Sequence, residues 1–477
     1  MRNRNCRKNF GWLIGLLLML CSSNLYAVQD SVKLTVRLRG VYDSKITITP
    51  YRNGLYKEPL KELAGVQTEV TMAIPKAYLP GQFLLRMDYR KQAADQPYPS
   101  EFIFFLNKDD LTIGINPLHT QPDSVRLKND QENTAYFSFM QENVGRRQQL
   151  IILEQVLAEY QPKGNRFYRD VEKEFEQKRT KYNEWIDQEI VQNQDLFVSR
   201  IFTFQKAPGV DWYASPEDHL KQQGEHYFDE IDFQDTLLLR TQAFNQYVTT
   251  YMRMFGMQAT SKPLQDSLFT LAGRIACEKA SAGHPKVYGW MVDYFYQGFE
   301  ALAIDPGIKM LAKHIQDPRC LTSKKQEILR RLDGMKKLVV GAKAPAFEAE
   351  MANEMQVRFK GISKDKDYGL LVFYDSACLH CKELLRNLHK WYAEPEHAAW
   401  LDVITLSVDD VRSDWESFHR GEDYAWTDLW ASGGINSQLA NDYYILSTPV
   451  MFIIDAENNI LHLPQSIDEV NQFIFGN

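Results

Sequence analysis

The sequence predicts a multidomain protein with an N-terminal antiparallel β-sandwich, a central all-α domain and a C-terminal α/β domain. Three observations lead to this prediction. Apolar and polar residues alternate up to about residue 117, which is the pattern of half-buried strands. From about Asp130 the apolar residues recur with the period of a helix, and beyond residue 339 buried strands alternate with amphipathic helices. We therefore expect the domains to span residues 28–125, 126–338 and 339–477.

Composition and charge narrow the possible functions. The chain has 477 residues, of which 44% are hydrophobic and 12% aromatic, enough for several packed cores. Its formal net charge is −7, with acidic and basic residues interspersed and no basic stripe. We therefore do not expect nucleic acid as a partner.

Residues 1–27 have the order of a secretory signal peptide. Four basic residues precede the apolar run from Leu13 to Leu20, which is too short to span a membrane, and Ala27 offers a cleavage point. Cys21 allows a second interpretation, a lipid anchor, although Leu20 before it is larger than lipoprotein signals prefer. Both interpretations predict an exported protein, periplasmic or membrane-anchored, in a compartment where disulfides persist.

The N-terminal domain is expected to consist of short strands. Residues 32–38 alternate apolar and polar side chains, and turn residues separate the later runs. The other expected strands are 46–49, 70–74, 83–89, 102–106 and 111–115. Such a series is typical of an antiparallel sandwich, and we find no catalytic constellation in it.

The central domain is expected to be helical, with its aromatic side chains in the core. One apolar face contains Leu150, Leu153, Leu157 and Tyr160, and the next contains Phe167, Val171, Phe175, Tyr182 and Trp185. His219 and His226 lack a third ligand nearby, so we expect no metal site there. Cys277 and Cys320 are either two buried thiols or a structural disulfide worth about 4 kcal/mol, and the sequence leaves both open.

The sequence Cys378-Leu379-His380-Cys381 is the strongest functional signal. An apolar run, residues 369–374, precedes it, and a helical pattern, residues 382–391, follows it. A helix that begins at Cys378 places this sulfur beside unpaired N–H groups and the positive end of the helix dipole, which favour a thiolate. Cys381 lies one turn further on, close enough for a disulfide with Cys378. Thr448-Pro449 later introduces another apolar run, residues 450–454.

This order resembles the thioredoxin-like superfamily, in particular the TlpA/ResA type of secreted thiol–disulfide oxidoreductase. The resemblance covers residues from about Gly341 to Asn477, and the opening residues 340–347 are similar to the start of that type. It implies a thioredoxin fold, a cis bond before Pro449, Cys378 as nucleophile and Cys381 as resolving thiol.

The resemblance also implies roles for neighbouring residues. Thr448 and Pro449 would present their backbone to the substrate. His380, placed as in DsbA and protein disulfide isomerase, would tune the Cys378 thiolate. No metal and no diffusible cofactor are implied, because the cysteine pair is the redox centre. The expected partners are protein thiols or disulfides and a membrane electron donor or acceptor.

The parts of the chain before the thioredoxin-like region also resemble known modules. The β-domain is similar to one found before thioredoxin modules in secreted Bacteroidetes proteins. Residues 226–233 and 239–241 look like a motif of a helical domain of unknown function from the same proteins. No activity follows from this likeness.

Two departures from the family are visible. Ala377 stands where the family has a tryptophan, and Val372 stands where cytoplasmic thioredoxin has a buried acid. Asp375 and Glu383 are the candidates to replace that acid.

Several alternatives remain open at this point. A CxxC pair can bind zinc, although a structural site needs four ligands and no second pair exists. The thioredoxin-like region could also be an inactive scaffold of a periplasmic or surface interaction protein. Reductase, oxidase and isomerase activities share the same motif, so the sequence leaves the direction of electron flow open.

Overall fold

The computed structural model describes residues 31–422 and 424–476, so the predicted signal peptide and Cys21 lie outside the described residues. Its contacts form two compact units. The first runs to Met291 and includes Arg319–Leu321, and the second contains Val292–Pro318 and the residues from Thr322 onward. The division falls inside helix α8 (Pro285–Ala301). Within the described ranges, no helix is both long and apolar enough to cross a membrane.

Two sheets that enclose one apolar core form the β-rich part of the first unit. One sheet has the strand order β5-β1-β8-β9, and the other has β3-β2-β6-β7 with β4 paired to β2. The strands are β1 (Ser31–Leu38), β2 (Asp43–Arg52), β3 (Leu55–Tyr56), β4 (Lys61–Val66), β5 (Glu69–Pro75), β6 (Gly81–Arg90), β7 (Tyr98–Leu106), β8 (Leu111–Ile115) and β9 (Arg126–Lys128). The prediction of purely antiparallel strands needs one correction, because β1 and β8 pair in parallel. The chain between them passes through the other sheet, and this allows β8 to return in the direction of β1.

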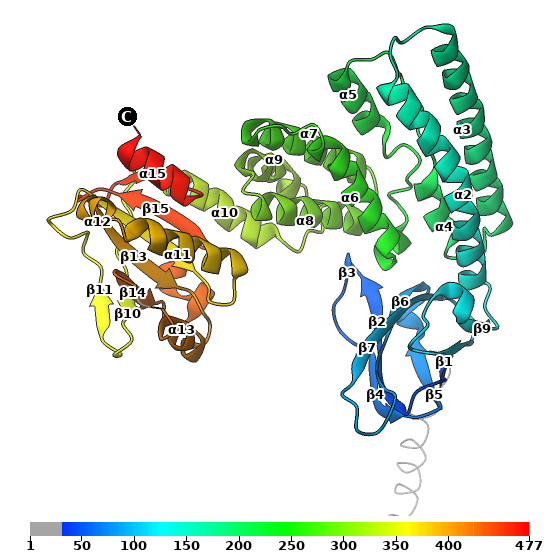
Figure 1. Ribbon diagram of the computed structural model, residues 1–477, viewed down its shortest axis with the longest axis horizontal. Helices are drawn as coiled ribbons and strands as arrows, with labels where there is room; N and C mark the ends of the chain where they lie inside the picture. Colours follow the sequence, from blue (N-terminus) through cyan, green and yellow to red (C-terminus); the bar gives the residue numbers. More distant parts are fainter. Residues whose placement is uncertain (1–30, 423, 477) are drawn as a thin grey trace, which may run out of the picture. The chain divides into compact units, whose positions relative to one another are not determined.

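The helices of the first unit follow the predicted apolar faces. They are α2 (Glu132–Glu159), α3 (Arg166–Gln192), α4 (Ser199–Phe202), α5 (Pro216–His226), α6 (Gln242–Gly256) and α7 (Lys262–Ser281). Figure 1 shows α2 and α3 as a long pair lying side by side. Buried Phe139 of α2 stacks on Trp185 of α3, with ring centroids 4.8 Å apart. Tyr160 and Phe167, both expected on buried faces, are 37% and 50% exposed. They lie at the end of α2 and the start of α3, where their rings contact each other with centroids 4.9 Å apart. Cys277 and Cys320 are both buried.

A mixed sheet forms the centre of the second unit, with the strand order β11-β10-β14-β13-β12-β15-β16. Strands β12, β13 and β14 are parallel, whereas β15 is antiparallel to β12. The strands are β10 (Glu348–Glu350), β11 (Gln356–Arg358), β12 (Tyr368–Tyr374), β13 (Leu401–Ser407), β14 (Thr427–Trp430), β15 (Val450–Ile454) and β16 (Ile460–His462).

Helices cover both faces of this sheet, because successive side chains of β12 point to opposite faces and both sets are apolar. Leu370, Val372 and Tyr374 face one core, which also contains residues of α11, α13 and α15. Leu371 and Phe373 face the opposite core, which contains residues of α14 and the end of α10. The helices of the second unit that follow α8 are α9 (Asp305–Gln316), α10 (Lys325–Lys337), α11 (Leu379–Tyr392), α12 (Pro395–Trp400), α13 (Arg412–His419), α14 (Gln438–Asp442) and α15 (Ile467–Phe475). The result is a three-layer α/β module.

Candidate active site

The two cysteines lie where the central strand β12 leads into α11. Cys378 is the N-cap residue of α11, with extended backbone angles (φ −75°, ψ 116°). The backbone N–H of Cys381 donates a hydrogen bond to Cys378 Sγ at 3.2 Å. The first sulfur thus accepts one of the N–H groups that the helix leaves unpaired, which stabilises negative charge on it.

Cys381 has very different surroundings. It is fully buried in the apolar core beneath α11, whereas Cys378 is partly exposed. Burial raises the pKa of the Cys381 thiol to about 12, and the adjacent Cys378 sulfur adds to the rise. Only Cys378 is therefore placed to react first with a molecule from outside.

Thr448 lies against Cys378, although it is 70 residues away in the sequence. The Cys378 thiol donates to the carbonyl oxygen of Thr448 at 3.6 Å. The Thr448–Pro449 peptide bond is cis, as the resemblance implies. The segment that leads into β15 thus places the Thr448 carbonyl directly beside the sulfur.

His380 and Leu379, between the cysteines, both point to the surface. Leu379 is 78% exposed, and His380 is also exposed and lines a groove together with Pro449. The structure therefore places His380 beside the cysteine pair, and its tuning role stays a prediction.

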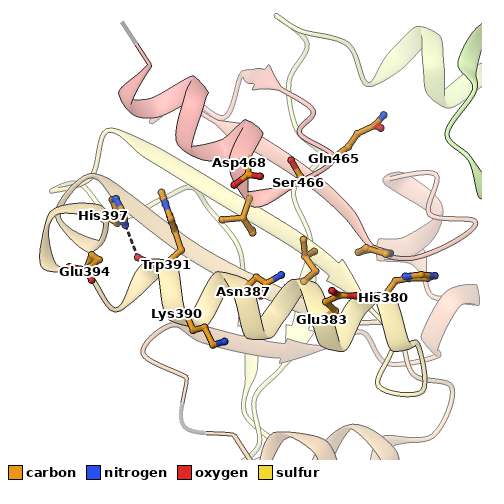
Figure 2. Close-up of a pocket in the computed structure, with 13 residues that line it drawn as sticks. His380, Glu383, Asn387, Lys390, Trp391, Glu394, His397, Gln465, Ser466 and Asp468 are labelled. Carbon is orange, nitrogen blue, oxygen red and sulfur yellow. Dashed lines mark hydrogen bonds between the residues drawn. The ribbon is translucent and has the colours of Figure 1, made fainter. Parts of the chain in front are cut away.

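The groove beside the cysteine pair has a volume of about 670 Å³ and runs along α11. Figure 2 shows His380 at the start of α11, and Trp391 and His397 at the far end. Trp391 and His397 stack, with ring centroids 4.0 Å apart, so the far end has a rigid aromatic wall. The lining contains three carboxylates, Glu383, Glu394 and Asp468, and the cation Lys390.

Asp409, which the sequence analysis did not identify, holds the loop before Cys378. Its buried carboxylate accepts hydrogen bonds from the backbone N–H of Ser376 at 3.0 Å and from Ser376 Oγ at 2.6 Å. Ser407 Oγ donates to the same carboxylate at 2.5 Å. Asp409 follows β13, the parallel neighbour of β12, so both strands end at the same edge of the sheet. An acid directly after a buried parallel strand was the available signal.

A second buried acid, Asp428 of β14, also escaped the sequence analysis. Its side chain is fully buried and accepts hydrogen bonds from four side chains at 2.6–3.0 Å. The donors are Tyr374, Thr405, Trp415 and His419. Tyr374 is the last residue of β12, so Asp428 fixes the strand end that leads to the cysteine pair.

The two candidates for the missing buried acid lie elsewhere. The Asp375 carboxylate accepts from the backbone N–H of Ala377 at 2.7 Å and so shapes the loop before Cys378. Glu383 is exposed and lines the groove. Neither is buried like the thioredoxin acid, and the buried acids of this region are Asp409 and Asp428.

The described residues contain no cluster of three or more histidine, cysteine, aspartate or glutamate side chains that could hold a metal ion. The site itself offers two thiols with unequal exposure, beside a backbone carbonyl and an open groove.

Comparison with known proteins gives one family match, to the AhpC/TSA family, over residues 340–463. Among solved structures, a thioredoxin-like protein from Bacteroides caccae is 16% identical; the match covers 56% of this chain and 96% of that chain, with a TM-score of 0.38. The thioredoxin domain of a thiol-disulfide oxidoreductase from Bacteroides vulgatus is 19% identical over 29% of this chain and 99% of that chain, with a TM-score of 0.26. No curated protein sequence matches the chain.

The family match and the fold agree on the same part of the chain. Residues 340–463 contain β12, the cysteine pair, α11 and β15, which are the elements that build the site. The sheet order, with helices on both faces and the CxxC sequence at the start of α11, is that of a thioredoxin fold. The C-terminal module is thus a thioredoxin-like domain whose sequence is similar to the AhpC/TSA family.

Proposed function

We propose that this protein is an exported thiol–disulfide oxidoreductase that exchanges disulfides with protein substrates through Cys378 and Cys381. One observation carries the proposal. A partly exposed sulfur at the start of α11 lies 3.2 Å from the N–H of Cys381 and 3.6 Å from the carbonyl of Thr448, while the second thiol is buried behind it. Unequal exposure of two thiols in one helical turn is what a two-step exchange requires.

The exchange proceeds through two displacements. The Cys378 thiolate attacks one sulfur of a substrate disulfide, forms a mixed disulfide and releases the other substrate sulfur as a thiolate. Cys381 then gives its proton to water and attacks Cys378 Sγ, which closes the Cys378–Cys381 disulfide and releases the second substrate thiolate, and the two substrate thiolates take up protons from water. Two electrons pass from the cysteine pair to the substrate, and the same steps in reverse oxidise a substrate dithiol.

The raised pKa of Cys381 gives the two steps their order. A thiol whose pKa is about 12 is protonated at neutral pH, so it does not compete with Cys378 for an incoming disulfide. It becomes a nucleophile only when the mixed disulfide brings a leaving group next to it.

The substrate would lie over Leu379 and Pro449 and enter the groove along α11. Leu379 offers an exposed apolar side chain directly beside the nucleophile, which suits an unfolded or extended segment. The groove adds carboxylates and one cation, so a segment with polar and basic side chains would fit. The substrate class is therefore a polypeptide disulfide.

The proposal includes a partner that restores the cysteine pair after each turnover. The signal-like residues 1–27 support an exported location, in which a membrane electron donor or acceptor would supply or remove the two electrons. The pair itself is the redox centre, and no other cofactor enters the exchange.

The test is disulfide reduction by the full mature chain. In the presence of dithiothreitol, wild-type protein should accelerate the reduction of insulin, and the double variant Cys378→Ser/Cys381→Ser should give only the uncatalysed rate. A Cys277→Ala/Cys320→Ala variant is the matched control, because both cysteines are buried in the first unit, and it should keep full activity. Equal rates with and without the Cys378–Cys381 pair would favour the scaffold alternative.

A further inference from the structure

The segment from Ala440 to Ser447, which leads into Thr448 and Pro449, is held by residues of α8 and α10. The guanidinium group of Arg330 donates to the carbonyl oxygens of Ala440 and Ile445 at 3.2 and 3.3 Å. Ser447 Oγ donates to the carboxylate of Glu300 at 3.3 Å. These residues of α8 and α10 precede the family match at residues 340–463, yet they contact the loop beside the sulfur.

Tyr444, near the middle of this segment, is fixed by α10 from two sides. Its hydroxyl donates to Asp333 at 2.7 Å and accepts from Lys337 Nζ at 2.8 Å. Its ring lies so close to Gly334 that an added Cβ there would be 2.7 Å from Tyr444 Cβ. The middle of the segment is therefore held by α10, and its last attachment before Thr448 is the bond from Ser447 to Glu300.

Glu300 is suited to this attachment because its own position is fixed. Its side chain is 16% exposed, and it pairs with Arg331, which lies 3.3 Å away and also binds Asp305 at 3.3 Å. A carboxylate that is largely removed from water needs such partners. Ser447 is exposed, so most of the restraint comes from the Glu300 side.

We propose that Glu300 is a positioning residue that fixes Ser447 and thereby the backbone of Thr448 and Pro449. That backbone would pair with an extended polypeptide beside the substrate disulfide, so Glu300 would favour polypeptide disulfides over small ones. The inference rests on the proposed function. It adds that α8 and α10 are part of the substrate-binding apparatus.

The experiment compares the full mature chain with the variants Glu300→Ala and Ser447→Ala. Asp305→Asn is the matched control, because Asp305 binds the same guanidinium and is 49% exposed. Three readouts are needed: hydrogen exchange of the backbone amides between residues 444 and 450, steady-state kinetics with insulin, and reaction with a small aromatic disulfide. Ser447→Ala changes an exposed residue, so it tests the idea even if Glu300→Ala does not fold.

We expect faster amide exchange in both variants. The KM for insulin should rise about threefold to tenfold, which is the change in affinity expected from the loss of one hydrogen bond. The kcat value, the reaction with the small disulfide and the Asp305→Asn control should stay unchanged. Unchanged exchange in both variants would overturn the inference. An equal loss with both kinds of disulfide would also overturn it, since this indicates general damage. A wild-type protein that reduces neither substrate would refute the proposed function, and the exchange data would still decide whether Glu300 positions the loop.

Discussion

Cys378 and Cys381 are three residues apart, yet the first turn of α11 gives their sulfur atoms different properties. One sulfur accepts a backbone hydrogen bond at the helix start and is partly exposed. The other is buried in an apolar core that raises its pKa to about 12. Of the two residues between them, His380 is exposed and lies in the first turn of α11, so a replacement there leaves the buried core intact.

Replacing His380 tests its influence on the redox pair. His380→Pro should make the Cys378–Cys381 pair more reducing by about tens of millivolts, because the thiolate would lose a favourable neighbour. Thioredoxin and DsbA differ by about 150 mV, which gives the scale. Proline is compatible with the first turn of a helix. Redox titration against glutathione measures the potential, with His389→Gln, an exposed change further along α11, as control. An unchanged or more oxidising potential would show that His380 does not stabilise the thiolate.

His419 and Asp428 make a pH-dependent contribution to stability. The hydrogen bond from His419 Nδ1 to the buried Asp428 carboxylate, 2.9 Å long, raises the pKa of His419 in the folded state. A raised folded-state pKa stabilises the protein fully below the unfolded value near 6.5 and loses this contribution as the pH rises through the folded value. His419→Gln should therefore lower the free energy of unfolding most at about pH 6 and less at higher pH. Urea unfolding of wild type and variant between pH 6 and pH 9 measures this, and a difference that grows with pH would contradict the assignment.

At the scale of single elements, Gly334 of α10 shows how closely this helix approaches Tyr444 of the thioredoxin-like module. At an exposed position inside a helix, alanine makes the helix more stable than glycine does, by about 1 kcal/mol. Gly334 of α10 is buried, and a Cβ there would lie 2.7 Å from Tyr444 Cβ and 2.8 Å from Cγ. A helix of ordinary composition could not come this close.

The variant Gly334→Ala should therefore destabilise the second unit by about 1–3 kcal/mol, the usual cost of overpacking. Gly298→Ala in α8 is the matched control, because an added Cβ there meets nothing within 4 Å. The control should be neutral or stabilising. Urea unfolding followed by tryptophan fluorescence compares the two, and a stabilised Gly334→Ala would show that α10 can move away from Tyr444.

The elements that the sequence predicted well are those with a local pattern. The apolar runs at residues 369–374 and 450–454 agree with β12 and β15 to within one residue, and α11 begins at Cys378 as predicted. Strand β14 was missed because it has only four residues, and its Asp428 is unusual in a strand. Its role depends on donors from β12, β13 and α13, and such contacts leave no local signal.

The contacts of α10 were invisible in the sequence for a similar reason. Charged residues from Arg330 to Lys337 looked like the end of a helical domain, and the predicted boundary at residue 339 follows this pattern. Arg330 and Lys337 bind groups more than 100 residues further along the chain. Long-range partners of this kind cannot be read from composition or periodicity.

At the scale of the whole molecule, α10 joins the compact unit that contains the cysteine pair. Leu338, directly after α10, is buried in the same core as Phe373 and Tyr443. We therefore expect a fragment of residues 322–477 to unfold at a higher temperature than a fragment of residues 339–477. Thermal unfolding followed by circular dichroism tests this, and equal melting temperatures would show that α10 adds nothing to the module.

The most direct test of the whole account is the trapping of mixed disulfides by the full chain. Cys381→Ser, Cys378→Ser and the double variant would be expressed in parallel with the signal-like residues retained, and covalent complexes would be separated on non-reducing gels and identified by mass. Cys381→Ser should accumulate complexes that a reductant dissolves, because its Cys378 still attacks substrates but nothing releases them. Cys378→Ser and the double variant should trap almost nothing, since the remaining Cys381 is buried and protonated. Equal trapping by the two single variants, or none by either, would contradict the assignment of Cys378 as the nucleophile.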